Sequence, residues 1–197
     1  MRARLIAGVV SLTGLVLAGC SSPSITGGTP GPTPTSSAES LPPGTPNVTH
    51  PLNVSNFHKT PCSTLTASQL QSLSVTVAGK DVSDANGPSC TWVDLDGPAK
   101  MGITVIIPNA SQGLAGIYGQ KDTFPVFTPL ANIGGFPAVI ALSADGRSQG
   151  NCQVSVGVSN SQLVEVAVTI GAGATDEATP CGRNQTVAAD VVATLKG

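Results

Sequence analysis

The chain has 197 residues and a formal net charge of −2, and charged side chains make up only 10% of it. No cluster of Lys and Arg follows the first four residues, so the basic footprint that nucleic acid or an anionic lipid surface requires is missing. Nucleic acid is therefore excluded as an expected partner. Hydrophobic residues make up 40% of the chain but aromatic ones only 3%, which predicts a core of mainly aliphatic side chains.

Residues 1–19 have the pattern of a lipoprotein signal peptide. Arg2 and Arg4 give a basic start, and residues 5–16 are uncharged and mostly apolar. This run is shorter than the ~20 residues of a membrane span, and small residues close it, as in a secretory signal. Leu17-Ala18-Gly19-Cys20 resembles a lipobox. We expect cleavage between Gly19 and Cys20, with a diacylglyceryl group on the Cys20 thiol.

The expected processing determines where in the cell the mature protein is located. Removing the leader leaves seven basic and eleven acidic residues, a net charge near −4. Two acyl chains suffice for stable anchoring, whereas one binds only marginally. We expect a protein held by lipid alone at the extracytoplasmic face of the cell membrane. The alternative is an ordinary cleaved leader with a chance cysteine.

Residues 20–56 are expected to form a tether that begins at the lipidated cysteine. Eight of the sixteen prolines fall between residues 21 and 51, mixed with Ser, Thr and Gly. Such a segment buries too little apolar surface to offset the entropy of ordering it, and its prolines favour extended conformations. Thr29, Thr33 and Thr35 are candidate glycan acceptors in a spacer that crosses a cell wall; the alternative is an unmodified linker.

Residues 57–197 are expected to form one folded domain. Its clearest local signal is a capping box between Thr66 and Gln69, with Leu65 and Leu70 as a hydrophobic staple, which predicts a short helix ending near Leu73. The further expected elements are strands 90–95 and 102–107 around the turn Asp96-Gly97-Pro98, a weak helix within 111–120, strands 136–142, 152–158 and 162–170, and a helix over 186–196. This order predicts an α+β domain in which helices pack on an antiparallel sheet.

Four cysteines remain after Cys20: Cys62, Cys90, Cys152 and Cys181. An even number in an exported domain indicates two disulfides, and three connectivities are open. The pairing of neighbours along the chain would join residues 28 and 29 positions apart. A metal site is the alternative, but no C-x-x-C pair occurs among them.

Several short motifs surround these cysteines. They are Pro61-Cys62-x-x-Leu65-Thr66, Cys90-Thr91-Trp92, Gly134-Gly135-Phe136-Pro137-Ala138, Cys152-x-Val154-x-Val156 and Pro180-Cys181 before the last helix. With the lipobox and the spacer, this pattern resembles the DUF3558 family, lipoproteins of actinobacteria without an assigned biochemical function. The resemblance covers residues 57–197 and implies the disulfides Cys62–Cys90 and Cys152–Cys181. It brings no catalytic residues, because the family has none defined.

The residues give little support to catalysis. His50 and His58 lie in or beside the expected tether, so no base stands near a nucleophile in the domain, and no G-x-S-x-G elbow occurs. Asp94 and Asp96 share a strand face, as hydrolase carboxylates do, but they also flank a turn where solvated aspartates are common. We expect no enzyme, no metal and no cofactor.

Three further motifs have a structural and a functional interpretation. Residues 84–87 (Asp-Ala-Asn-Gly) resemble part of a calcium loop but lack the later Glu, which favours a plain loop. Residues 171–174 (Gly-Ala-Gly-Ala) lack the full phosphate-binding pattern, which favours a turn. Trp92 could stack on a sugar or an acyl chain, but beside Cys90 on a strand it is expected to pack in the core.

Two functions remain. The first expectation is a non-catalytic envelope lipoprotein that binds a protein partner. The alternative is a carrier or sensor of an apolar or glycolipid ligand, held between the sheet and its helices, with residues 124–137 as an adjustable lip. An apolar-lined pocket of at least ~300 Å³ would favour the carrier, and a flat apolar patch of several hundred Å² would favour the partner.

Intact-mass spectrometry tests the expected processing. The protein, purified in mild detergent from a host that lipidates, should have the mass of the chain from Cys20 plus an acylated glycerol, less four hydrogens for two disulfides. Replacing Cys20 with Ala should remove the lipid mass and release the protein from the membrane fraction. A native protein without lipid mass would make it a freely secreted domain.

Overall fold

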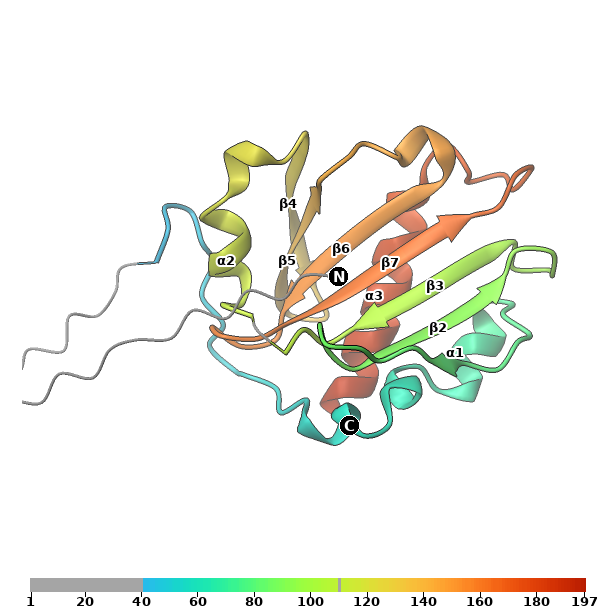
Figure 1. Cartoon of the computed structure of the whole chain (residues 1–197), viewed down its shortest axis with the longest axis horizontal. Coiled ribbons are helices and arrows are strands. Elements are labelled where there is room, and N and C mark those ends of the chain that lie inside the picture. Colours follow the sequence, from blue (N-terminus) through green and yellow to red (C-terminus); the bar gives the residue numbers. More distant parts are fainter. Residues whose placement is uncertain (1–40, 110) are drawn as a thin grey trace, which may run out of the picture. The chain divides into compact units, whose positions relative to one another are not determined.

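A computed structural model of the chain describes residues 41–109 and 111–197. The expected leader, Cys20 and the first part of the tether lie outside the described residues. The described part is an α+β domain in which a seven-stranded antiparallel sheet carries helices on its faces (Figure 1). The predicted fold class is therefore confirmed.

The sheet has the strand order β1-β2-β3-β7-β6-β5-β4, and every neighbouring pair is antiparallel. A hairpin, β2–β3, and a four-stranded meander, β4 to β7, meet at the β3–β7 pair. The strands are β1 (Lys80–Asp81), β2 (Ser89–Asp94), β3 (Met101–Ile106), β4 (Val126–Ile133), β5 (Phe136–Leu142), β6 (Asn151–Gly157) and β7 (Leu163–Ile170).

Five of these strands were predicted from the sequence to within about one residue, and two were missed. β1 has only two residues, too few for a periodic signal. β4 contains Pro129, which argues against a central strand. The structure places β4 at the sheet edge, where the proline's missing N–H removes no hydrogen bond to a further strand. Its pairing with β5 also shifts between Leu130 and Ile133.

The helices are α1 (Ala67–Ser72), α2 (Leu114–Tyr118) and α3 (Pro180–Lys196). The capping box at α1 is present in both directions, between Thr66 and Gln69. α3 starts six residues before the predicted position, because Pro180 is well suited to a first helical turn whereas Gly182 weakens the helical pattern there. None of the helices in the described ranges is long and apolar enough to cross a membrane.

One face of the sheet packs against α3 and holds the main core. The side chains that face α3 come from alternate positions of the central strands: Ile103 and Val105 of β3, Val154 and Val156 of β6, and Val164, Val166 and Val168 of β7. Val187, Ala188, Val191 and Val192 meet them from α3, each at most 1% exposed. Residues of β7 alternate between the two faces of the sheet, so Glu165 lies on the opposite side from Val164 and Val166.

Two disulfides tie this layer together, with the connectivity that the resemblance implied. Cys62–Cys90 joins the turn before α1 to β2, and Cys152–Cys181 joins β6 to the first turn of α3. The chain passes so close to the first bridge that a Cβ on Gly79 would lie 2.8 Å from the Cys90 sulfur. The same Cβ would lie 2.7 Å from the indole nitrogen of Trp92, which is 1% exposed. The core interpretation of Trp92 is confirmed.

The domain begins earlier than residue 57, so the prediction that the tether runs to residue 56 is wrong in its last part. Val48 and Val54 are buried, and they belong to the main core. The backbone N–H of Leu52 donates to Val158 (2.8 Å), and that of Val48 donates to the Asn160 side chain (2.8 Å). An extended segment makes no hydrogen bonds within itself, so its backbone N–H groups are free to donate to the domain. The amino-acid composition of the segment does not indicate such bonds.

Asn184 is a polar residue in the core between α3 and the sheet. Its side-chain N–H groups donate to the carbonyls of Cys152 (2.7 Å) and Val166 (2.8 Å), so it joins the helix to β6 and β7. Its Oδ1 is buried without a hydrogen-bond partner among the described residues. Because both donors reach strand carbonyls, we infer that Asn184 fixes the position of α3 along the sheet.

Replacing Asn184 with Ala should lower the free energy of unfolding by about 1–3 kcal/mol, because two buried hydrogen bonds are lost. Gln185→Ala is the control: its side chain donates only to Cys181 within the same helix, so a change within about 0.5 kcal/mol is expected. Urea unfolding with intact disulfides measures both. Equal losses would show that Asn184 has no special role.

Candidate functional site

The second face of the sheet is only partly covered. Alternate residues of β3, β6 and β7 point away from α3: Thr104 and Ile106, Gln153 and Ser155, and Leu163, Glu165 and Ala167. α2 covers one end of this face, where Leu114 and Tyr118 form a second small core with Val139 and Leu163. A Cβ on Gly157 would lie 3.0 Å from Leu114, so the glycine lets α2 approach the sheet.

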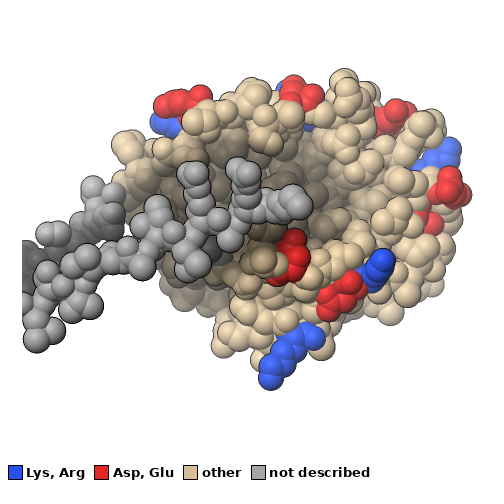
Figure 2. All heavy atoms as spheres, in the orientation of Figure 1, with Lys and Arg blue, Asp and Glu red and all other residues tan. Residues whose placement is uncertain are grey.

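A hollow of about 550 Å³ lies between α2 and the sheet; we call it the sheet hollow. Its apolar lining includes Ile117, Phe124 and Leu163, and its polar lining includes Gln112, Gln120 and Glu165. The remaining lining residues are Pro108, Ser111, Gly113 and Gly116. Figure 2 views this face of the molecule, and its middle is visibly hollowed.

A second hollow of about 320 Å³ adjoins the first and shares Phe124 with it; we call it the strand-gap hollow. It lies where β5 and β6 separate, because these strands pair only at Ala138–Val156 and Val139–Ser155. Its lining comes from the end of β5 and the loop that follows, from the start of β6, and from Ala167 to Thr169 of β7. Together the two hollows span the uncovered face from α2 to the β5–β6 gap.

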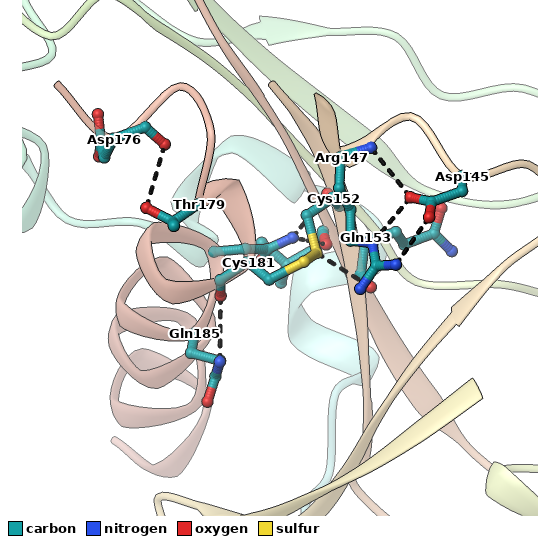
Figure 3. The surroundings of a disulfide bond; sticks show 10 residues. Asp145, Arg147, Cys152, Gln153, Asp176, Thr179, Cys181 and Gln185 are labelled. Carbon is teal, nitrogen blue, oxygen red and sulfur yellow. Dashed lines mark hydrogen bonds and ion pairs between the residues drawn. A yellow bond between two sulfur atoms is a disulfide. The ribbon is translucent and has the colours of Figure 1, made fainter. Parts of the chain in front are cut away.

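The Cys152–Cys181 disulfide lies close to the strand-gap hollow, because Cys152 is one of its lining residues. Figure 3 shows the bridge with the neighbouring loop, in which Asp145 and Arg147 form a two-point ion pair. The Arg147 hydrogen bonds lower the pKa of Asp145 to about 2. This pair is exposed, so its contribution to stability is small.

Glu165 is the one titratable residue among those lining the two hollows. Across the sheet it lies opposite Ile106 on β3 and Ser155 on β6. Within the described residues its carboxylate has no ion-pair or hydrogen-bond partner. Burial therefore raises its pKa, because the charged form loses hydration.

A third hollow, of about 560 Å³, lies between residues 46–52 and the β4–β5 turn, and it includes the Gly134–Pro137 motif. His50 and Lys196 are its ionisable lining residues, and Lys196 donates to the Gly134 carbonyl at 3.4 Å. His50 therefore belongs to the folded part, although it was expected in the tether, and His58 ends the short 3-10 turn Ser55–His58 of the same part. Both side chains are exposed.

The structure gives Asp94 and Asp96 different environments. Asp94 is 5% exposed and accepts hydrogen bonds from the backbone N–H (2.7 Å) and the hydroxyl (3.1 Å) of Thr76. Asp96 is exposed in the turn after β2. Asp94 thus fixes the loop after α1. These hydrogen bonds explain why the Asp94 carboxylate is buried, and no catalytic pairing with Asp96 is needed to explain it.

The other candidate motifs are turns. Asp84 accepts from the backbone and the side chain of Asn86, which closes the 84–87 loop on itself. In the 171–174 turn, Gly173 donates to Glu177 (2.9 Å) just before α3. Across residues 41–109 and 111–197, no group of three or more His, Cys, Asp and Glu side chains is placed to hold a metal ion.

Glu165 was not predicted as a site residue from the sequence. The available signal was a single charged residue in the apolar run from Leu163 to Val168. That pattern equally describes a solvated strand face. Only the position of α2 over the neighbouring strands shows that the carboxylate lies in a hollow.

The chain belongs to the family described as "Protein of unknown function (DUF3558)", whose model matches residues 15–194. The resemblance seen in the cysteine motifs is therefore confirmed. No curated protein and no solved structure matches the chain.

Replacing Glu165 with Gln should stabilise the protein near neutral pH. Because the pKa of Glu165 is raised in the folded state, the folded protein binds this proton more tightly than the unfolded chain does. The resulting contribution to folding stability is fully present below the ordinary pKa of 4.5 and is lost as pH rises through the folded-state pKa. Gln cannot ionise and escapes this loss. We expect a melting temperature a few degrees higher than wild type near pH 7 and no gain below about pH 4.

Thermal melts over this pH range make the comparison. Glu177→Gln removes the same charge from the loop before α3 and keeps an oxygen that can accept from the Gly173 N–H, so it should give no gain. If both variants gain equally near pH 7, the effect belongs to net charge and not to the hollow.

Proposed function

We propose that this protein is a non-catalytic envelope lipoprotein that carries or senses an amphiphilic ligand in the sheet hollow and the adjoining strand-gap hollow. The observation that carries the proposal is a concavity of about 550 Å³ on the one sheet face that α3 leaves uncovered. Ligand sites in proteins have this size and this combination of apolar walls with a few polar groups.

The shape favours a ligand over a flat protein partner, although the sequence put the partner first. The large hydrophobic side chains that stand exposed in the described part are Leu41, Val82, Val93 and Leu95. Only Val93 is more than half exposed, at 58%. Because Val93 is on β2, on the same side of the sheet as the hollow, a protein partner that covers this face is the second candidate.

The rest of the proposal rests on the sequence. Cleavage before Cys20 and its lipidation would hold the protein at the outer face of the cytoplasmic membrane. Because Val48 and Val54 pack in the domain core, the proposed spacer is shorter than residues 20–56. A carrier held there would pass its ligand within the envelope without any chemical step.

Filling the hollow should abolish ligand binding. Gly116 lies on α2 and lines the sheet hollow, and the nearest atom to an added Cβ is 3.4 Å away on the Gln112 side chain. We expect Gly116→Leu to weaken binding of N-phenyl-1-naphthylamine, a neutral apolar fluorescent probe, at least tenfold. Fluorescence titration of the full lipoprotein in mild detergent below its micellar concentration measures this.

Gly182→Leu is the matched control. Gly182 is also a helical glycine, on the exposed side of α3, and an added Cβ there meets nothing within 4 Å. Both substitutions improve helix propensity, but only the first enters the hollow. Saturable binding that survives Gly116→Leu, or no saturable binding by wild type, would overturn the proposed function.

A further inference from the structure

The carboxylate in the sheet hollow is costly for the protein to hold. Glu165 faces Ile106 and Ser155 across the sheet, and Leu163 and Ala167 precede and follow it on its own strand face. None of these residues carries a positive charge. Glu165 is half-buried, so its carboxylate keeps part of its hydration. A carboxylate that loses hydration without a paired cation or hydrogen-bond donors still lowers the stability of a fold.

The segment from Gln112 to Phe124, which contains α2 and lies over the hollow, does not supply a cation either. Gln112 and Gln120 are the long polar side chains that this segment contributes to the lining. Lys121 and Asp122 follow α2, but both are exposed and neither is a lining residue. In the described part of the chain, the charge of Glu165 is thus left without an internal counterion.

We propose that the ligand carries a protonated amine that pairs with Glu165, while its apolar body lies against Ile117, Phe124 and Leu163. This inference rests on the proposed function and specifies the chemistry of its ligand. The amine supplies both the missing charge and the missing hydrogen-bond donors, and charge-assisted N–H to carboxylate bonds are among the strong ones in proteins. One carboxylate in the hollow fits one positive charge on the ligand.

The size of the site fits the same ligand. The apolar side chains of the sheet hollow continue through Phe124 into the strand-gap hollow, where the lining includes Ala141, Leu142 and Ala167. A ligand with its amine at Glu165 therefore has apolar wall available in the direction of the β5–β6 gap. An anionic headgroup in the same position would meet the carboxylate and be repelled.

The test compares three probes of equal chain length, decylamine, decanol and decanoate, below their aggregation concentrations near pH 7. Each competes with N-phenyl-1-naphthylamine for the full lipoprotein, and direct calorimetric titration confirms the affinities. Wild type should bind decylamine about tenfold or more tighter than decanol, the discrimination that a hydrogen bond to a charged group gives. Decanoate should be the weakest of the three.

Two variants assign the preference to one residue. Glu165→Gln should abolish the preference for decylamine while decanol binds as before, and Glu177→Gln, with the same loss of charge outside the hollow, should retain it. Equal binding of decylamine and decanol by wild type, with both lost in Gly116→Leu, would overturn the amine proposal but leave the ligand site intact. Failure of all three probes and of the naphthylamine would overturn both.

Discussion

Seven strands present two broad faces, and the described chain has a single long helix to cover them. α3 packs across β6 and β7 on one side, and the apolar residues that it buries there are at most 6% exposed: Val187, Ala188, Val191, Val192 and Leu195. α2 has only five residues and covers one end of the other side. A part of a sheet face that no second layer covers stays open to solvent. The hollows beside α2 therefore exist because the helices are too short to cover the whole of this face. The proposed function depends on the same shortage.

The covered side is correspondingly well fastened. Cys152–Cys181 ties the first turn of α3 to β6, and Asn184 adds hydrogen bonds to the carbonyls of β6 and β7 within the next turn. Cys62–Cys90 fixes the segment before α1 to β2. These disulfides and hydrogen bonds all lie on the side of the sheet that α3 covers. They fix the strands whose opposite face carries Glu165. A binding site needs such support to hold its polar groups in place.

Much of this architecture could be predicted from the sequence. β6 and β7 were predicted to within one residue of their observed bounds, and the Thr66–Gln69 capping box placed α1. The resemblance supplied the disulfide pairing, which spacing alone left open. Pro129 concealed β4, and the composition of residues 41–56 concealed their packing on the domain, because hydrogen bonds to distant partners leave no local pattern. Glu165 could not be predicted as a site residue, because the hollow around it arises from tertiary packing of α2.

The most direct test of the account is a crystal structure of the lipoprotein purified from its native host without solvent extraction. We predict density for a non-protein molecule in the sheet hollow, with a nitrogen about 2.7–2.9 Å from the Glu165 carboxylate and an apolar portion that extends past Phe124. A hollow filled only by water, or by the protein's own side chains, would contradict the claim that this sheet face is a ligand site.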